Sequence, residues 1–173
     1  MPKILQSLYD QLKQAAKDLT RLRMNDENRI KLYETALNHL DKDASPLDRA
    51  PDELACVETV MKIYKIAFGE YFYKGNTLST YYLLKALKES ALWKQVYIPA
   101  AGDFIISPTG YGTRKNPDGS LVISNGHVGI IMFDGIASND SRDGIFRVNY
   151  TIEKWADRWV RRGGYPALYF RRI

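Results

Sequence analysis

The sequence contains one cysteine and only two histidines among its 173 residues. One cysteine cannot form an internal disulfide, and these few residues give no cluster with the spacing of a zinc site. We therefore expect neither a metal site nor a bound cofactor. Long apolar runs are also missing, because no stretch approaches the ~18 to 20 apolar residues of a membrane span. We expect no transmembrane segment.

The first residues lack the uninterrupted apolar stretch and the small-residue cleavage site of a signal peptide, which predicts synthesis in the cytoplasm. Positive charge is in only modest excess, with a net charge of +5. This excess favours approach to a polyanion such as nucleic acid, an anionic lipid surface or a bacterial cell wall. The basic residues are spread out and have no nucleic-acid motif around them, so we expect no nucleic-acid partner.

Hydrophobic residues make up 45% of the chain, which is ordinary for a globular protein of one compact domain. A stripe of apolar residues at steps of three and four predicts a helix over residues 4–23. Its members are Leu5, Leu8, Leu12, Ala15, Leu19 and Leu22. A second helix begins near Asp26 and ends near Leu40, so residues 1–42 form a helical hairpin. The stripe either docks on its own domain or supports self-association.

Residues 43–173 are predicted to form the main domain. A helix that follows Pro51 and ends at Gly69 carries Cys56, and a shorter helix covers residues 79–89. Short β-prone runs then cover residues 103–107, 121–124, 127–133, 136–138 and 167–172, with a helix capped by Thr151 before the last run. Asp134-Gly135 indicates a hairpin. The expected fold class is α+β, with a small antiparallel sheet.

Cys56 and His127 are the candidate chemical residues. A thiol near the N-terminal end of a helix has a lowered pKa, because the helix dipole favours the thiolate. A lone cysteine beside Leu54 and Val57 is also typical of a small buried apolar residue. His127 follows a loop at the start of a predicted strand, where one ring nitrogen can stay accessible, although a core histidine has the same pattern.

A catalytic imidazole needs a third group that fixes its tautomer. The strand after the Asp134-Gly135 turn runs back beside His127 and ends in Ser138-Asn139-Asp140. Since a shift of one residue turns a side chain to the other face of the sheet, two assignments are open. We choose Asn139, with Asp140 as the second choice.

Cys56, Gly102-Asp103-Phe104, His127-Val128-Gly129-Ile130 and Asn139 occur in the order found in papain-like cell-wall hydrolases of the NlpC and CHAP type, which this sequence resembles. Residues 43–46, 51–54 and 138–141 resemble small bacteriophage-encoded members. The resemblance implies a papain-like core on which the helix with Cys56 packs against the sheet. The sequence departs from the family pattern at Ala55-Cys56-Val57-Glu58, where NlpC proteins have Asp-Cys-Ser-Gly.

The resemblance implies a cysteine endopeptidase or amidase that cleaves an amide bond of peptidoglycan at the cell wall, in phage lysis or at the virion. Cys56 would attack the amide carbonyl and His127 would move the proton, with Asn139 or Asp140 orienting the ring. The alternative is a non-enzymatic virion or assembly protein that associates through its N-terminal helices. An acyltransferase or a protease with a protein substrate would use the same groups.

Overall fold

The computed structural model describes residues 26–45, 51–75 and 78–173. The helix expected over residues 4–23, and with it the leucine stripe from Leu5 to Leu22, lies outside these residues. Among the described helices none is both long enough and apolar enough to cross a membrane. The same part of the chain contains no group of three or more His, Cys, Asp or Glu residues that could hold a metal ion.

The centre of the molecule is a seven-stranded sheet in the order β1-β6-β5-β4-β3-β7-β2, in which all neighbouring strands are antiparallel. Its strands are β1 (Lys42–Asp43), β2 (Trp93–Val96), β3 (Phe104–Ser107), β4 (His127–Ile131), β5 (Ile136–Asn139), β6 (Ile145–Tyr150) and β7 (Leu168–Arg172). The buried strands β3, β4 and β5 lie side by side in the middle, so their side chains are covered on both faces.

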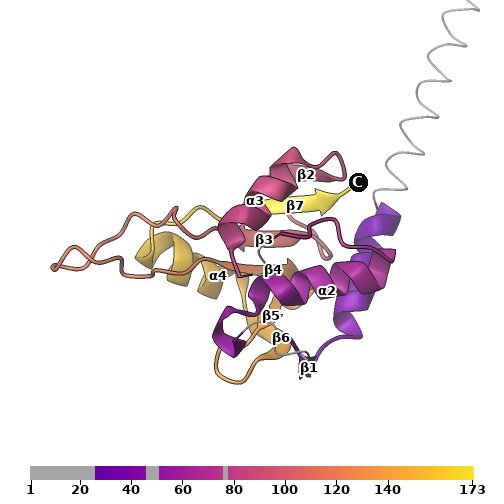
Figure 1. Ribbon diagram of the computed structural model, residues 1–173, viewed down its shortest axis with the longest axis horizontal. Helices are drawn as coiled ribbons and strands as arrows, with labels where there is room; N and C mark the ends of the chain where they lie inside the picture. Colours follow the sequence, from indigo (N-terminus) through magenta and orange to yellow (C-terminus); the bar gives the residue numbers. More distant parts are fainter. Residues whose placement is uncertain (1–25, 46–50, 76–77) are drawn as a thin grey trace, which may run out of the picture.

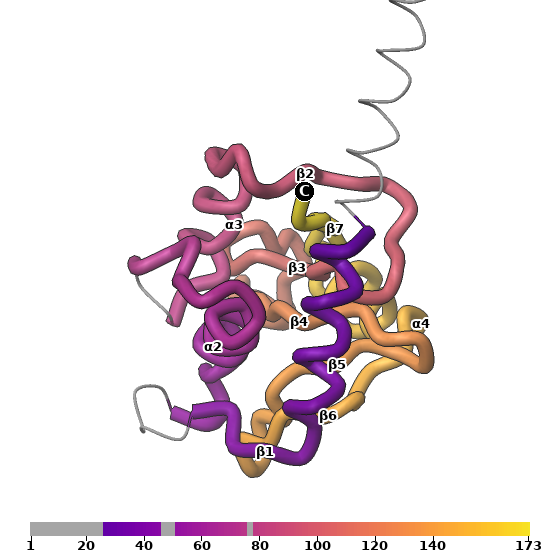
Figure 2. Tube along the Cα trace, turned by 90° about the vertical axis from the view of Figure 1, so that its right-hand side faces the viewer, coloured from indigo at the N-terminus to yellow at the C-terminus, as the bar shows by residue number. Residues whose placement is uncertain are grey.

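Helices cover both faces. Residues 26–37 are helical, and the other helices are η1 (Asp52–Leu54), α2 (Cys56–Phe68), α3 (Thr80–Glu89), α4 (Ile152–Trp155) and the π-helical η2 (Ala156–Arg162). α2 ends as the sequence predicts, at Gly69 with a left-handed φ of 84°. Thr151 caps α4, because its side chain accepts a hydrogen bond from the Lys154 backbone N–H. Figure 2 shows α2 on one side of the strands and α4 on the other.

Alternation along the strands produces two separate cores. Phe104 and Ile106 of β3 join the larger core, which also contains the apolar faces of α2 and α3. Ile105, between them in the sequence, joins the smaller core around Trp155 and Trp159. The odd-numbered residues of β4 therefore face α4 and η2, whereas the even-numbered residues face α2.

The helix over residues 26–37 packs on the larger core through Leu32 and Ala36. A close backbone approach fixes its first turn. Arg29 donates a hydrogen bond of 2.6 Å to the carbonyl of Ala101, and a Cβ at Gly102 would lie 2.1 Å from the Arg29 carbonyl oxygen. Glycine is required at this position, since its φ is also positive at 92°. The division into residues 1–42 and 43–173 stays a prediction.

The fold is α+β, but the expectation of a papain-like, NlpC/CHAP-like core on a small sheet is wrong. The sheet has seven strands, and three of them, β1, β2 and β6, were not predicted. Lys42 and Asp43 of β1 are exposed, and β2 has only Trp93 fully buried, so neither has an apolar pattern. The run 121–124 instead forms a single bridge between Leu121 and Lys115. Figure 1 shows this segment within the long loop that projects from the sheet between β3 and β4.

Candidate active site

Cys56 is the first residue of α2, in agreement with the predicted position near a helix N-terminus. Its side chain is only 6% exposed and belongs to the larger core. Burial raises the pKa of the Cys56 thiol to about 11, and this effect outweighs the backbone N–H groups of Val128, Val57 and Cys56 that are directed at the sulfur and lower it. The resting thiol is therefore protonated at neutral pH.

His127 is the first residue of β4 and its ring is covered by aromatic side chains. The imidazole stacks on Trp159, with ring centroids 5.0 Å apart and 2° between the planes. Trp155 and Tyr150 approach it at 5.5 Å and 5.9 Å. Burial, together with the positive charge of Arg158, lowers the pKa of His127 to about 3. The ring is neutral at neutral pH.

A chain of hydrogen bonds assigns the tautomer of this neutral ring. Nδ2 of Asn149 donates to the Asn139 carbonyl at 3.3 Å, which leaves Oδ1 of Asn149 as the acceptor for the Ser138 hydroxyl at 2.8 Å. Ser138 has one proton and gives it to Asn149, so its Oγ accepts from Nε2–H of His127 at 2.9 Å. The proton of the imidazole is therefore on Nε2, and Nδ1 carries a free lone pair.

Nδ1 of His127 has no hydrogen-bond partner among the described residues, and it is not among the completely buried unpartnered atoms. The His127 side chain as a whole is 8% exposed. His127 faces the side of the sheet covered by α4 and η2, while α2 with Cys56 covers the other side. The backbone N–H of Val128, the residue after His127 in β4, is directed at the Cys56 sulfur. No hydrogen bond joins Sγ of Cys56 to the imidazole in the described part of the chain.

Asn139 and Asp140, predicted as the group that orients His127, make other contacts. Asn139 is 1% exposed, and its Nδ2 donates a 2.6 Å hydrogen bond to the carbonyl of Asp52 in η1, directly before α2. Asp140 pairs with Arg142 at 2.5 Å, and this hydrogen bond lowers the pKa of Asp140 to about 2. The orienting group is Ser138, one residue before the predicted one.

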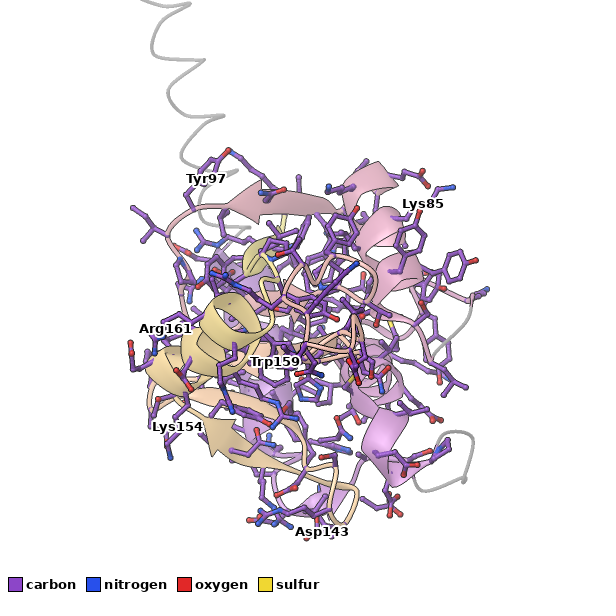
Figure 3. The ribbon with its side chains drawn as sticks, turned by 90° about the vertical axis from the view of Figure 1, so that its left-hand side faces the viewer. Lys85, Tyr97, Asp143, Lys154, Trp159 and Arg161 are labelled. Atoms are coloured by element: carbon purple, nitrogen blue, oxygen red, sulfur yellow. The ribbon has the colours of Figure 1, made fainter. Side chains whose placement is uncertain are left out.

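Sequence reasoning missed Ser138, Asn149 and Trp159. The signal for Ser138 is the pairing of Ile131 with Ile136 across the β4–β5 hairpin, because this register places odd residues of β4 and even residues of β5 on one face. Asn149 lies on β6, which was not predicted as a strand. Figure 3 shows Trp159 at the centre of the face that η2 and the nearby loops surround.

Comparison with known proteins gives little similarity. No protein-family model matches the chain, and no curated protein matches it. Among solved structures, a chain of the type VI native effector-immunity complex Tae3-Tai3 from Ralstonia pickettii is similar over 84% of this chain and 98% of that chain. The sequence identity is 16% and the TM-score is 0.47.

The resemblance to the NlpC and CHAP families is therefore corrected. No family model matches the chain, so none supports membership of these families. The expectations that rested on the resemblance fall with it. These are a bacteriophage origin, action as an endolysin or cysteine peptidase, and degradation of peptidoglycan. The short motifs around Cys56 and His127 do occur in the same order as in these families, but so few short motifs do not define a family.

Proposed function

We propose that this chain is a cysteine enzyme that acts on an acyl group, an amide or an ester, with Cys56 as the attacking group and His127 as the base. The observation that supports it is the tautomer of His127. The hydrogen bonds from His127 to Ser138 and from Ser138 to Asn149 hold the proton on Nε2 and leave Nδ1 of His127 without a proton at the start of β4. In this proposal the unprotonated Nδ1 is the nitrogen that accepts the proton of the thiol.

In the proposed reaction the Cys56 S–H gives its proton to Nδ1 of His127 as the sulfur attacks the carbonyl carbon. The leaving amine or alcohol takes that proton from the imidazolium, and a thioester remains on Cys56. The acceptor that then releases the acyl group regenerates the thiol. Since the pKa values keep both groups neutral at rest, proton transfer accompanies attack and no resting ion pair is required. Backbone N–H groups around the sulfur support the developing oxyanion.

The test uses p-nitrophenyl acetate, an activated ester, with the intact mass of the protein as a readout. The full chain should release p-nitrophenol and gain one acetyl group on Cys56, the only cysteine. Cys56→Ala should lose both signals, and His127→Ala should slow acetylation by about 100-fold or more. The matched control is His39→Gln, because His39 is the other histidine and contacts Phe146 on a different part of the molecule. Equal ester cleavage by the full chain and by Cys56→Ala would refute the proposal.

A second candidate is a non-enzymatic assembly protein that acts by associating with another chain. Two observations favour it: the thiol is buried and protonated, and no hydrogen bond links it to His127. Large apolar side chains are also exposed at the tips of loops, with Tyr97, Ile98 and Phe133 each more than four-fifths accessible. Exposed apolar residues of this size are common at contact surfaces between proteins.

Sedimentation separates the two candidates. An assembly protein should sediment as a complex that Tyr97→Ser or Phe133→Ser weakens, while Cys56→Ala leaves its mass unchanged. A cysteine enzyme without this role should sediment as a monomer at all concentrations. A monomer that is also inactive toward the ester would contradict both candidates.

A further inference from the structure

A cavity of about 420 Å³ is lined in part by Tyr150, whose ring contacts His127, and plays no part in the proposed reaction. It is open to solvent and is formed by the end of β6, α4 and η2. Its lining consists of Tyr150, Glu153, Lys154, Asp157, Arg158, Arg161 and Arg162. Four of these side chains are cations and two are carboxylates, so the cavity has an excess of positive charge.

The carboxylates of the cavity are already paired. Glu153 contacts Arg161 at 2.7 Å, and Asp157 contacts Arg161 and Arg162 at 3.3 Å each. Arg158 and Lys154 have no carboxylate partner within the described ranges. The excess charge of the cavity is therefore carried by these two side chains.

Arg158 contacts an aromatic ring and has no ion pair within the described ranges. Its guanidinium lies over the ring of Trp159, 5.1 Å from the ring centroid. The ring of Trp159 also stacks on the imidazole of His127, so Arg158 and His127 contact the same aromatic ring. Figure 3 shows Lys154 and Arg161 on the same face of the molecule as Trp159.

We propose that this cavity binds an oxyanion group, either a carboxylate or a phosphate. The guanidinium of Arg158 and the ammonium group of Lys154 would bind the anion. Arginine binds both kinds of anion through two parallel N–H donors, and the contact with the ring of Trp159 restricts the guanidinium before an anion binds. The hydroxyl of Tyr150, which lines the same cavity, provides a neutral hydrogen-bond donor.

The site is independent of the chemistry at Cys56. An anion bound by Arg158 would also reduce the positive field that this side chain exerts on His127, whose pKa it lowers. Binding alone tests this inference, whether or not the proposed reaction occurs.

The experiment titrates the full chain with sodium acetate and, separately, with inorganic phosphate, at constant ionic strength kept with chloride. Tryptophan fluorescence is the readout, because Arg158 covers Trp159, and calorimetry measures the same binding. We expect a saturable signal, and the anion that binds more tightly identifies the source as a carboxylate or a phosphate. Cys56→Ala should bind as the unchanged chain does, which separates this test from that of the reaction.

Arg158→Ala should weaken binding by about tenfold or more. Arg158→Lys should keep only part of the affinity, because lysine lacks the two parallel N–H donors. Arg162→Ala is the matched control, since Arg162 lines the same cavity but is paired with Asp157. It should change affinity by less than about twofold. Far-ultraviolet circular dichroism checks that each variant is folded. No saturable binding, or equal losses in Arg158→Ala and Arg162→Ala, would overturn the assignment.

Discussion

Ser138 accepts a hydrogen bond from Nε2 of His127 at 2.9 Å across the β4–β5 pair. This contact determines which nitrogen of the imidazole can act as a base, because the Ser138 proton is directed to Asn149. The neutral ring has one N–H donor and one bare nitrogen, and the donor is the nitrogen that faces Ser138. The orientation of the candidate base thus depends on two neighbouring strands and not on the residues beside it in sequence.

The first prediction concerns this tautomer. Nitrogen-15 spectra of the full chain at pH 7 should show His127 protonated on Nε2 and bare on Nδ1, because Ser138 accepts only from Nε2. Ser138→Ala removes the acceptor and should produce a mixture of both tautomers. His39→Gln assigns the signals, as only one histidine then remains. An Nδ1–H tautomer in the unchanged chain would show that Ser138 donates its proton to Nε2 of His127 and not to Asn149.

The second prediction concerns the reactivity of Cys56. Because burial raises the pKa of its thiol to about 11, alkylation by iodoacetamide should be slow at pH 7 and should rise about tenfold per pH unit up to pH 10. The chain unfolded in guanidinium is the control, and its rate should level off above the ordinary pKa of 9.0. A folded-state rate that is already constant above pH 8 would mean that the thiol is much more acidic than its burial implies.

The sequence predicted the helices well, because their signals are local. Gly69 ends α2 and Thr151 caps α4 through contacts with residues three or four positions away. Pro51 and the acids after it mark the start of a helical segment, which in the structure is η1 (Asp52–Leu54), directly before α2. Capping depends on side chains near in sequence, so it can be predicted without knowing the tertiary structure.

The orienting group of His127 could not be chosen in the same way. Asn139 and Ser138 are adjacent in sequence but lie on opposite faces of β5, and only the register of the hairpin decides between them. Asn149 comes from β6, whose alternation has only Phe146 fully buried. β6 can be recognised as a strand only from its pairing with β5. Its own residue pattern does not indicate a strand.

The third prediction concerns acid stability. The pKa of His127 is lowered to about 3 in the folded chain, so its contribution to stability is complete above the unfolded value of 6.5. It is lost as the pH falls from 6.5 toward 3, because only the unfolded chain binds the proton in this range. Between pH 4 and 6, the free energy of unfolding of the unchanged chain should fall more steeply than that of His127→Gln, by about 1.4 kcal/mol per pH unit. Urea unfolding at several pH values measures both slopes, and parallel curves would contradict the prediction.

The last prediction concerns Asp103, which is fully buried and is held by three hydrogen bonds. Arg171 donates to it through Nε at 2.9 Å and Nη2 at 2.7 Å, and the backbone N–H of Ala100 donates at 2.8 Å. The pair joins β7 to the loop before β3, next to the close approach of Gly102 and Arg29. Removing one partner leaves the other charge without compensation, so Asp103→Ala should lower the free energy of unfolding by about 3 to 5 kcal/mol.

Arg171→Lys keeps the charge but loses one of the two parallel N–H donors, so its loss should be smaller than that of Asp103→Ala. The exposed pair of Lys85 and Glu89, whose charged atoms are 3.9 Å apart, provides the control. Lys85→Ala should leave the urea midpoint nearly unchanged, because solvent screens an exposed pair. The midpoints of the three variants, compared at a constant slope of the urea transition, test the prediction. An Asp103→Ala variant as stable as Lys85→Ala would show that Arg171 and Ala100 are solvated without cost when the carboxylate is absent.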